Sequence, residues 1–146
     1  MLRVFPERLL GLLALAALPL GLTGCGGGPA RMKLYPVTGQ VYLNDKPLAD
    51  HRVVFLPVDK TKYEREHPFA ITDKEGKFRL STYEQGDGAP AGEFVVVFFP
   101  NDELDDGSDQ RKRTSPLPSK YMAADKSDFR VKIEGGTDLP PFKLQK

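Results

Sequence analysis

The residue with the most distinctive chemistry in this chain is Cys25, the only cysteine among 146 residues. A single thiol cannot form an intramolecular disulfide, so its reactivity remains for another purpose. The residues immediately before it, Leu22, Thr23 and Gly24, are one apolar residue followed by two small ones.

Other reactive side chains are few. The chain has two histidines, His51 and His67, and no Gly-x-Ser-x-Gly or similar setting for a nucleophile. The acidic stretch at 102–109 suggests calcium, but on an EF-hand template with Gly107 in sixth place, Leu104 and Arg113 occupy two ligand positions. We therefore expect no catalytic residues, no metal site, no cofactor and no enzymatic activity, and a solvated acidic loop at 102–109.

The elements before Cys25 have the order of an export signal. Arg3 and Arg8 supply a positive start, and residues 9–22 form an uncharged, mainly apolar run that is too short for a typical spanning helix. Residues 22–25 at the end of this segment resemble the lipobox of bacterial lipoproteins. The resemblance implies a signal peptide at 1–24, cleavage between Gly24 and Cys25, and lipidation of Cys25. One acyl chain binds a membrane marginally, whereas two or more hold it stably.

The resulting mature chain is expected to be tethered and formally neutral. Removing residues 1–24 takes away two arginines and one glutamate from a chain whose net charge is +1. A neutral balance of interspersed charges does not indicate nucleic-acid binding, which needs a basic face. Residues 25–35 read as the lipidated cysteine and a flexible spacer, and residues 36–146 are the length of one domain.

Within that domain the pattern is one of short β-strands separated by turn residues. The candidate strands are 37–43, 52–56, 69–72, 77–81, 93–99, 129–134 and 142–144. A hairpin turn is expected at 73–76, where Gly76 can adopt a positive φ angle, and Pro140 and Pro141 delay the last strand. No amphipathic helix is evident. The expected fold is all-β, a single seven-stranded antiparallel β-sandwich, and the polar stretch 102–122 is too long for an ordinary connection.

Several of these segments together resemble small bacterial lipoproteins that carry a carboxypeptidase-regulatory-like, transthyretin-like β-sandwich domain. The segments that carry the resemblance are Val-Thr-Gly-Gln-Val at 37–41, Lys-Pro-Leu-Ala at 46–49, Val-Val-Phe-Leu-Pro at 53–57, Thr-Asp-Lys-Glu-Gly-Lys-Phe at 72–78, the Gly- and Pro-containing stretch at 82–94, and Pro-Ser-Lys-Tyr at 118–121. The resemblance covers most of the mature chain. It implies a seven-stranded sandwich and a cell-envelope location, and no catalytic residues.

Two of the expected strands are apolar on both faces. If Val53 and Phe55 point inward, the outward positions on the first strand are apolar, and 93–99 repeats this pattern. The outward residues form a candidate partner surface: Val54, Leu56, Val95, Val97 and Phe99. Alternatively the 102–122 stretch or the 58–68 segment covers this face, or the register is shifted by one residue.

Taken together, the sequence predicts a lipid-anchored, exported protein of the cell envelope with a non-catalytic binding or structural domain. The expected partners are the membrane, through the lipid on Cys25, and an unidentified envelope protein or glycan. The alternative is a carbohydrate- or calcium-binding module on the same anchor, for which Tyr42, Tyr83, Tyr121 and the acidic loop are the candidates.

Overall fold

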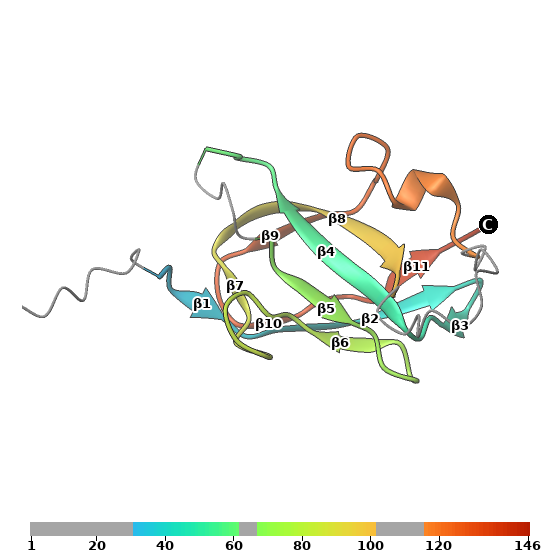
Figure 1. Ribbon diagram of the computed structural model, residues 1–146, viewed down its shortest axis with the longest axis horizontal. Helices are drawn as coiled ribbons and strands as arrows, with labels where there is room; N and C mark the ends of the chain where they lie inside the picture. The colour runs from blue at the N-terminus through green and yellow to red at the C-terminus, as the bar shows by residue number, and fades with distance from the viewer. Residues whose placement is uncertain (1–30, 62–66, 102–115) are drawn as a thin grey trace, which may run out of the picture. The chain divides into compact units, whose positions relative to one another are not determined.

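The computed structural model describes residues 31–61, 67–101 and 116–146, and in these ranges the secondary structure is almost entirely β (Figure 1). The predicted signal peptide, Gly24, Cys25 and the acidic stretch 102–109 lie outside the described residues. All seven candidate strands are present, and four short ones are added: β1 (Leu34–Tyr35), β3 (Lys46–Pro47), β7 (Ala89–Pro90) and β10 (Thr137–Asp138). The all-β prediction is therefore confirmed. Among the described residues, no helix is long and apolar enough to cross a bilayer.

The first sheet is built around β2 (Val37–Leu43). Along one side of β2 run β6 (Lys77–Arg79) and β3, both antiparallel to it. The connection from β2 to β3 is a two-residue turn in which Asn44 and Asp45 both have positive φ angles, of 49° and 61°. That combination matches the right-handed twist of a hairpin, and Asn and Asp tolerate it better than most residues.

The strands on the other side of β2 show that the prediction of a purely antiparallel sandwich was wrong. β10 and β11 (Phe142–Leu144) both pair with β2 in the parallel direction. After β9 (Arg130–Ile133) the chain passes to the other sheet, and the amides of Thr137 and Leu139 donate to carbonyls at positions 36 and 38 of the β2 segment. A hairpin makes its second strand antiparallel to its first. The connection from β9 to β10 instead crosses from one sheet to the other, so it does not force β10 and β11 to run antiparallel to β2.

The second sheet has the order β5–β4–β8–β9 and is antiparallel throughout. Its central strands are β4 (His51–Pro57) and β8 (Gly92–Pro100), and its edges are β5 (Phe69–Ile71) and β9. In β8 the residues that face the first sheet, Phe94, Val96 and Phe98, are fully buried, as the sequence alternation predicts.

The two sheets enclose one core in which aromatic rings meet across the layers. Phe55 of β4 lies 6.3 Å from Phe78 of β6, and Phe98 of β8 lies 5.7 Å from Phe142 of β11, measured between ring centroids. Edge-to-face and tilted ring pairs of this kind add to the stability given by burial alone. The core thus joins strands from both sheets.

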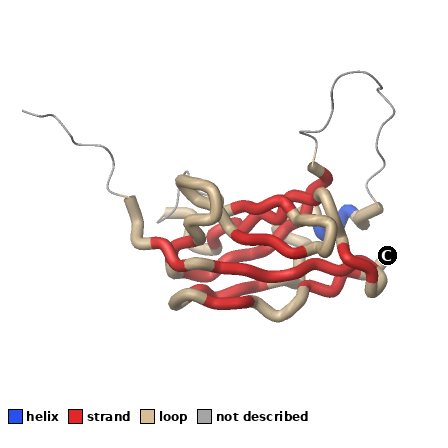
Figure 2. Tube along the Cα trace, turned by 90° about the horizontal axis from the view of Figure 1, so that it is seen from below, coloured by secondary structure: helices blue, strands red, loops and turns tan. Residues whose placement is uncertain are grey.

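A short 3-10 turn (Ser119–Tyr121) closes the core at the end of the molecule where the C-terminus lies (Figures 1 and 2). Leu117 and Tyr121 are buried in the core cluster. The Tyr121 hydroxyl donates to the carbonyl of Gln145 at 3.1 Å and accepts from the Gln145 amide at 3.0 Å. These bonds hold the residues after β11 against the core.

Candidate functional site

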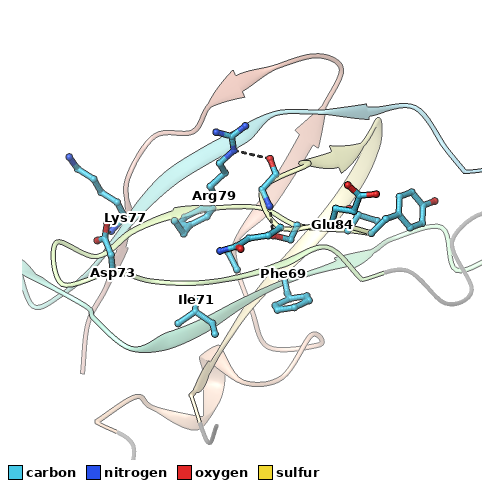
Figure 3. Close-up of a pocket in the computed structure, with 13 residues that line it drawn as sticks. Phe69, Ile71, Asp73, Lys77, Arg79 and Glu84 are labelled. Carbon is cyan, nitrogen blue, oxygen red and sulfur yellow. Dashed lines mark hydrogen bonds between the residues drawn. The ribbon is translucent and has the colours of Figure 1, made fainter. Parts of the chain in front are cut away.

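A groove of about 860 Å³ lies beside the β5–β6 hairpin (Figure 3). That volume lies within the range of small-molecule sites. Two segments line it: the hairpin itself, and the loop that follows β6. The lining residues are Phe69, Ala70, Ile71, Asp73, Lys77, Phe78, Arg79, Ser81, Thr82, Tyr83, Glu84, Gln85 and Gly86.

The hairpin forms a groove because its two strands belong to different sheets. β5 pairs with β4, and β6 pairs with β2. The strands meet at an isolated bridge between Phe69 and Ser81, and again where the Asp73 amide donates to the Lys77 carbonyl. No ladder joins β5 to β6 between these points. The opposed residues Ile71 and Arg79 lie between these two points of contact, and both line the groove.

The turn at one end of the opening is the one expected from the sequence. Gly76 has a φ angle of 73°, and a Cβ atom there would overlap the carbonyl oxygen of Val41. The Asp73 carboxylate accepts hydrogen bonds from the amides of Glu75 and Lys77, at 3.0 and 2.8 Å. An Asp side chain that binds main-chain amides in this way fixes a tight turn. The position of Lys77 at the groove is thereby set by the turn.

The loop at the other side of the groove is organised by Asp87. Its carboxylate accepts main-chain hydrogen bonds from Thr82, Tyr83 and Glu84, at 2.7 to 2.9 Å. Two further bonds tie the loop together: the Thr82 hydroxyl donates to the Gly88 carbonyl, and the Gly86 amide donates to the Ser81 hydroxyl. Three amides directed at one carboxylate make this loop a preorganised wall.

Asp87 is also the groove-side group with a resolved pKa shift. Partial burial raises the pKa of its carboxyl, but the hydrogen bonds from the amides of Thr82, Glu84 and Tyr83 outweigh burial and lower the pKa below its ordinary value of 3.8. A carboxyl with a lowered folded-state pKa stabilises the fold fully above its unfolded-state pKa. That stability is lost as the pH falls through the folded-state pKa.

We therefore expect Asp87→Asn to reduce the free energy of unfolding at pH 7 by about 1–2 kcal/mol, a value discounted for the partial exposure of the site. The difference from wild type should shrink as the pH falls below about 4, because the wild-type carboxylate is then protonated as well. Urea unfolding at several pH values measures this. Asp125→Asn, at an exposed position in a turn, is the control. A deficit that does not change with pH would contradict the role given to the Asp87 charge.

Of the charged side chains at the groove, some form ion pairs with described residues and others do not. Glu84 forms an ion pair with Arg31 at 3.1 Å. Lys77 and Arg79, by contrast, make no ion pair with any described residue; Arg79 uses its Nε to donate to the Gly86 carbonyl at 2.8 Å. This bond orients the guanidinium and leaves its two terminal nitrogens without a partner in the described part of the chain. Both cations are exposed on β6, two residues apart and on the same face.

The segment 31–35, which the sequence assigns to the spacer, lies against the same loop. The Arg31 guanidinium sits 5.3 Å from the Tyr83 ring centroid, and the Met32 amide donates to the Tyr83 hydroxyl at 3.2 Å. Leu34 and Tyr35 form β1 and pair with β7. These contacts join residues 31–35 to the unit that extends to Lys146.

The residues of the candidate partner surface on β4 and β8 are largely shielded from solvent. Val95 is 8 % exposed and Val97 is 0 % exposed, although both lie on the face of the sheet that points away from the main core. Val54, Leu56 and Phe99 are half-buried. The register prediction is correct, but Val95 and Val97 are not available to a partner on this face. Phe69 and Ile71, on the neighbouring edge strand, are exposed by 39 % and 38 %.

The tyrosines and histidines singled out from the sequence have different positions. Tyr83 lines the groove, Tyr42 is half-buried on β2, and Tyr121 is in the core. His67 is exposed before β5, and His51 has its Nδ1 2.7 Å from the Ala49 carbonyl oxygen. No group of three or more His, Cys, Asp or Glu side chains in the described ranges is placed to hold a metal ion.

Sequence reasoning missed the groove and most of the residues that line it. Lys77 and Arg79 alternate with the buried Phe78, which indicates only that they are exposed. Phe69 and Ile71 alternate with the buried Ala70, and two exposed apolar residues on one short strand were the available signal. Comparison with protein-family models, curated proteins and solved structures found no match to this chain. Since no matching protein indicates a site, the groove is taken as the candidate site because of its volume and its lining residues.

Proposed function

We propose that this protein is a lipoprotein of a bacterial cell envelope, anchored through Cys25, whose non-catalytic domain binds a ligand at the β5–β6 groove. The observation that carries the anchor is the position of residues 22–25 at the end of a complete export signal, with Cys25 the only thiol in the chain. The site would lie on the exported side of the membrane.

We also propose the finer fold, a seven-stranded β-sandwich similar to the transthyretin-like, carboxypeptidase-regulatory-like domains. Two features support it. The seven candidate ranges overlap the longer strands, and two sheets face each other across one aromatic core. The parallel pairing of β11 with β2 is the feature that a purely antiparallel description does not include.

The groove supports a binding role because its walls are held in place by main-chain contacts. Asp87 fixes one wall, Asp73 fixes one end, and Lys77 and Arg79 are left without ionic partners in the described part of the chain. Preorganised polar groups bind at a lower entropic cost than mobile ones. The Arg31–Glu84 ion pair also joins the groove to the segment that leads back to Cys25.

The anchor would keep the groove close to the membrane. Five residues lie between Cys25 and Arg31, and the six residue-to-residue steps of a fully extended chain span at most about 20 Å. Arg31 contacts Glu84 and Tyr83, which line the groove. A ligand of this domain should therefore be found within a few tens of ångströms of the bilayer surface.

The test of the anchor compares the wild-type chain with Cys25→Ala in a bacterial host. The wild-type protein should sediment with membranes, and intact-mass spectrometry should show a mature chain that begins with an acylated Cys25. Cys25→Ala should lose the acyl mass and leave the membrane fraction. Membrane association of Cys25→Ala equal to that of wild type, or a wild-type chain without acylation, would overturn the proposed anchor.

A further inference from the structure

Two cations of β6, Lys77 and Arg79, lie at the groove and form no ion pair with the residues that the structure describes. Figure 3 shows Lys77 and Arg79 leaving the hairpin on the same side, with the Arg79 guanidinium held by the Gly86 carbonyl. Neighbouring outward positions on a strand are about 7 Å apart, so one oxyanion can lie between the two side chains. The nearby carboxylates are already engaged: Asp73 binds two amides and Glu84 pairs with Arg31.

The other residues of the groove restrict the class of ligand that it can bind. The opening between β5 and β6 is closed at Phe69–Ser81 and at Asp73–Lys77, so an added peptide strand could not pair along it. Around this opening are groups that both donate and accept hydrogen bonds, including the Ser81 hydroxyl and the Gln85 amide, together with the Tyr83 ring. Hydroxyl-rich ligands match such mixed donors and acceptors.

We infer that the groove binds an acidic saccharide whose carboxylate or phosphate group lies between Lys77 and Arg79. This inference rests on the proposed role of the groove as the binding site, but it does not depend on the lipid anchor. The sugar hydroxyls meet Gln85 and the polar atoms of the 81–86 loop. Binding weakens with rising salt, because the two cations are exposed and their attraction for the anion is screened.

The experiment titrates the full-length protein in detergent with four probes: a galacturonic acid trisaccharide, its methyl ester, glucose 6-phosphate and inorganic phosphate. We expect at least one of the two acidic sugars to bind, and the uncharged ester to bind about tenfold or more weakly than the acid if the carboxylate is the recognised group. Arg79→Gln and Lys77→Gln should each weaken the binding of the acidic sugar about tenfold. Lys77 is the safer variant, because its ammonium makes no hydrogen bond to any described residue.

The control is Lys126→Gln, which removes an exposed cation outside the groove and should leave the affinity unchanged. Several outcomes overturn the inference: neither acidic sugar binds, both β6 variants bind as wild type does, or inorganic phosphate binds as tightly as the sugars. Because detergent keeps the chain in solution with or without acylation, a failed titration is separate from a failed anchor. Thermal unfolding of each variant checks that the fold is retained.

Discussion

Val97→Lys is expected to lower the free energy of unfolding by about 4 kcal/mol or more, which would leave much of the protein unfolded. Val97 is fully buried, on the face of β8 that points away from the main core. A lysine there must either bury an ammonium without a partner or force the covering groups apart. Both costs are large compared with the marginal stability of a single domain. Chemical denaturation with circular dichroism measures the effect.

The matched control is Phe69→Lys in the same cross-strand row. Val97 pairs with Val54, and Val54 pairs with Phe69, so the three residues lie side by side on one face. Phe69 is 39 % exposed, and its ring has the Arg52 guanidinium 5.4 Å from its centroid. Losing that contact should cost no more than about 1 kcal/mol. A stable, soluble Val97→Lys protein would show that this face is open to solvent and would restore it as a docking surface.

Val97 illustrates what the alternation of residues along a strand can predict and what it cannot. Alternation in 93–99 predicts correctly that Phe94, Val96 and Phe98 share the core face and that Val95 and Val97 share the other. It does not say whether the second face is covered, because burial depends on what packs against the sheet from elsewhere in the chain. The choice between a docking surface and a buried layer therefore needed the fold.

The groove was unpredictable for a related reason. The turn at 73–76 was predicted from its Asp and Gly residues, because turn chemistry is local. The opening beside it exists because β5 and β6 join different sheets, which is a property of tertiary pairing. The parallel partner of β2 was missed in the same way: residues 142–144 were identified as a strand, but a strand pattern carries no information on direction.

Gly88→Ala should have the second-largest effect, a loss of about 2–4 kcal/mol in the free energy of unfolding. Gly88 has a φ angle of 102°, which side chains of L-residues rarely adopt, and a Cβ atom there would overlap the carbonyl oxygen of Tyr35. The clash cannot be relieved by rotating a side chain, since the obstructing atom belongs to the main chain of β1. Either Gly88 changes its backbone angles or β1 moves away from β7.

Either movement has a consequence at the groove that stability alone does not report. The Gly88 amide donates to the Leu80 carbonyl, and its carbonyl accepts from Thr82, so a changed backbone at 88 disturbs the loop held by Asp87. Displacing β1 also removes the contacts of Arg31 with Glu84 and Tyr83. Hydrogen exchange should therefore rise at both 32–35 and 82–84 in Gly88→Ala, even under conditions in which the core amides of β4 and β8 stay protected.

Gly135→Ala separates these effects from a general cost of replacing glycine. Gly135 lies in the turn after β9, and a Cβ atom there would have no neighbour within 4 Å. Its substitution should change the free energy of unfolding by less than about 0.5 kcal/mol and leave exchange at 32–35 unaltered. Equal stability of the two variants would mean that Tyr35 does not lie against Gly88. Segment 31–35 would then belong to the flexible spacer predicted at 25–35, and the link between the anchor and the groove would be lost.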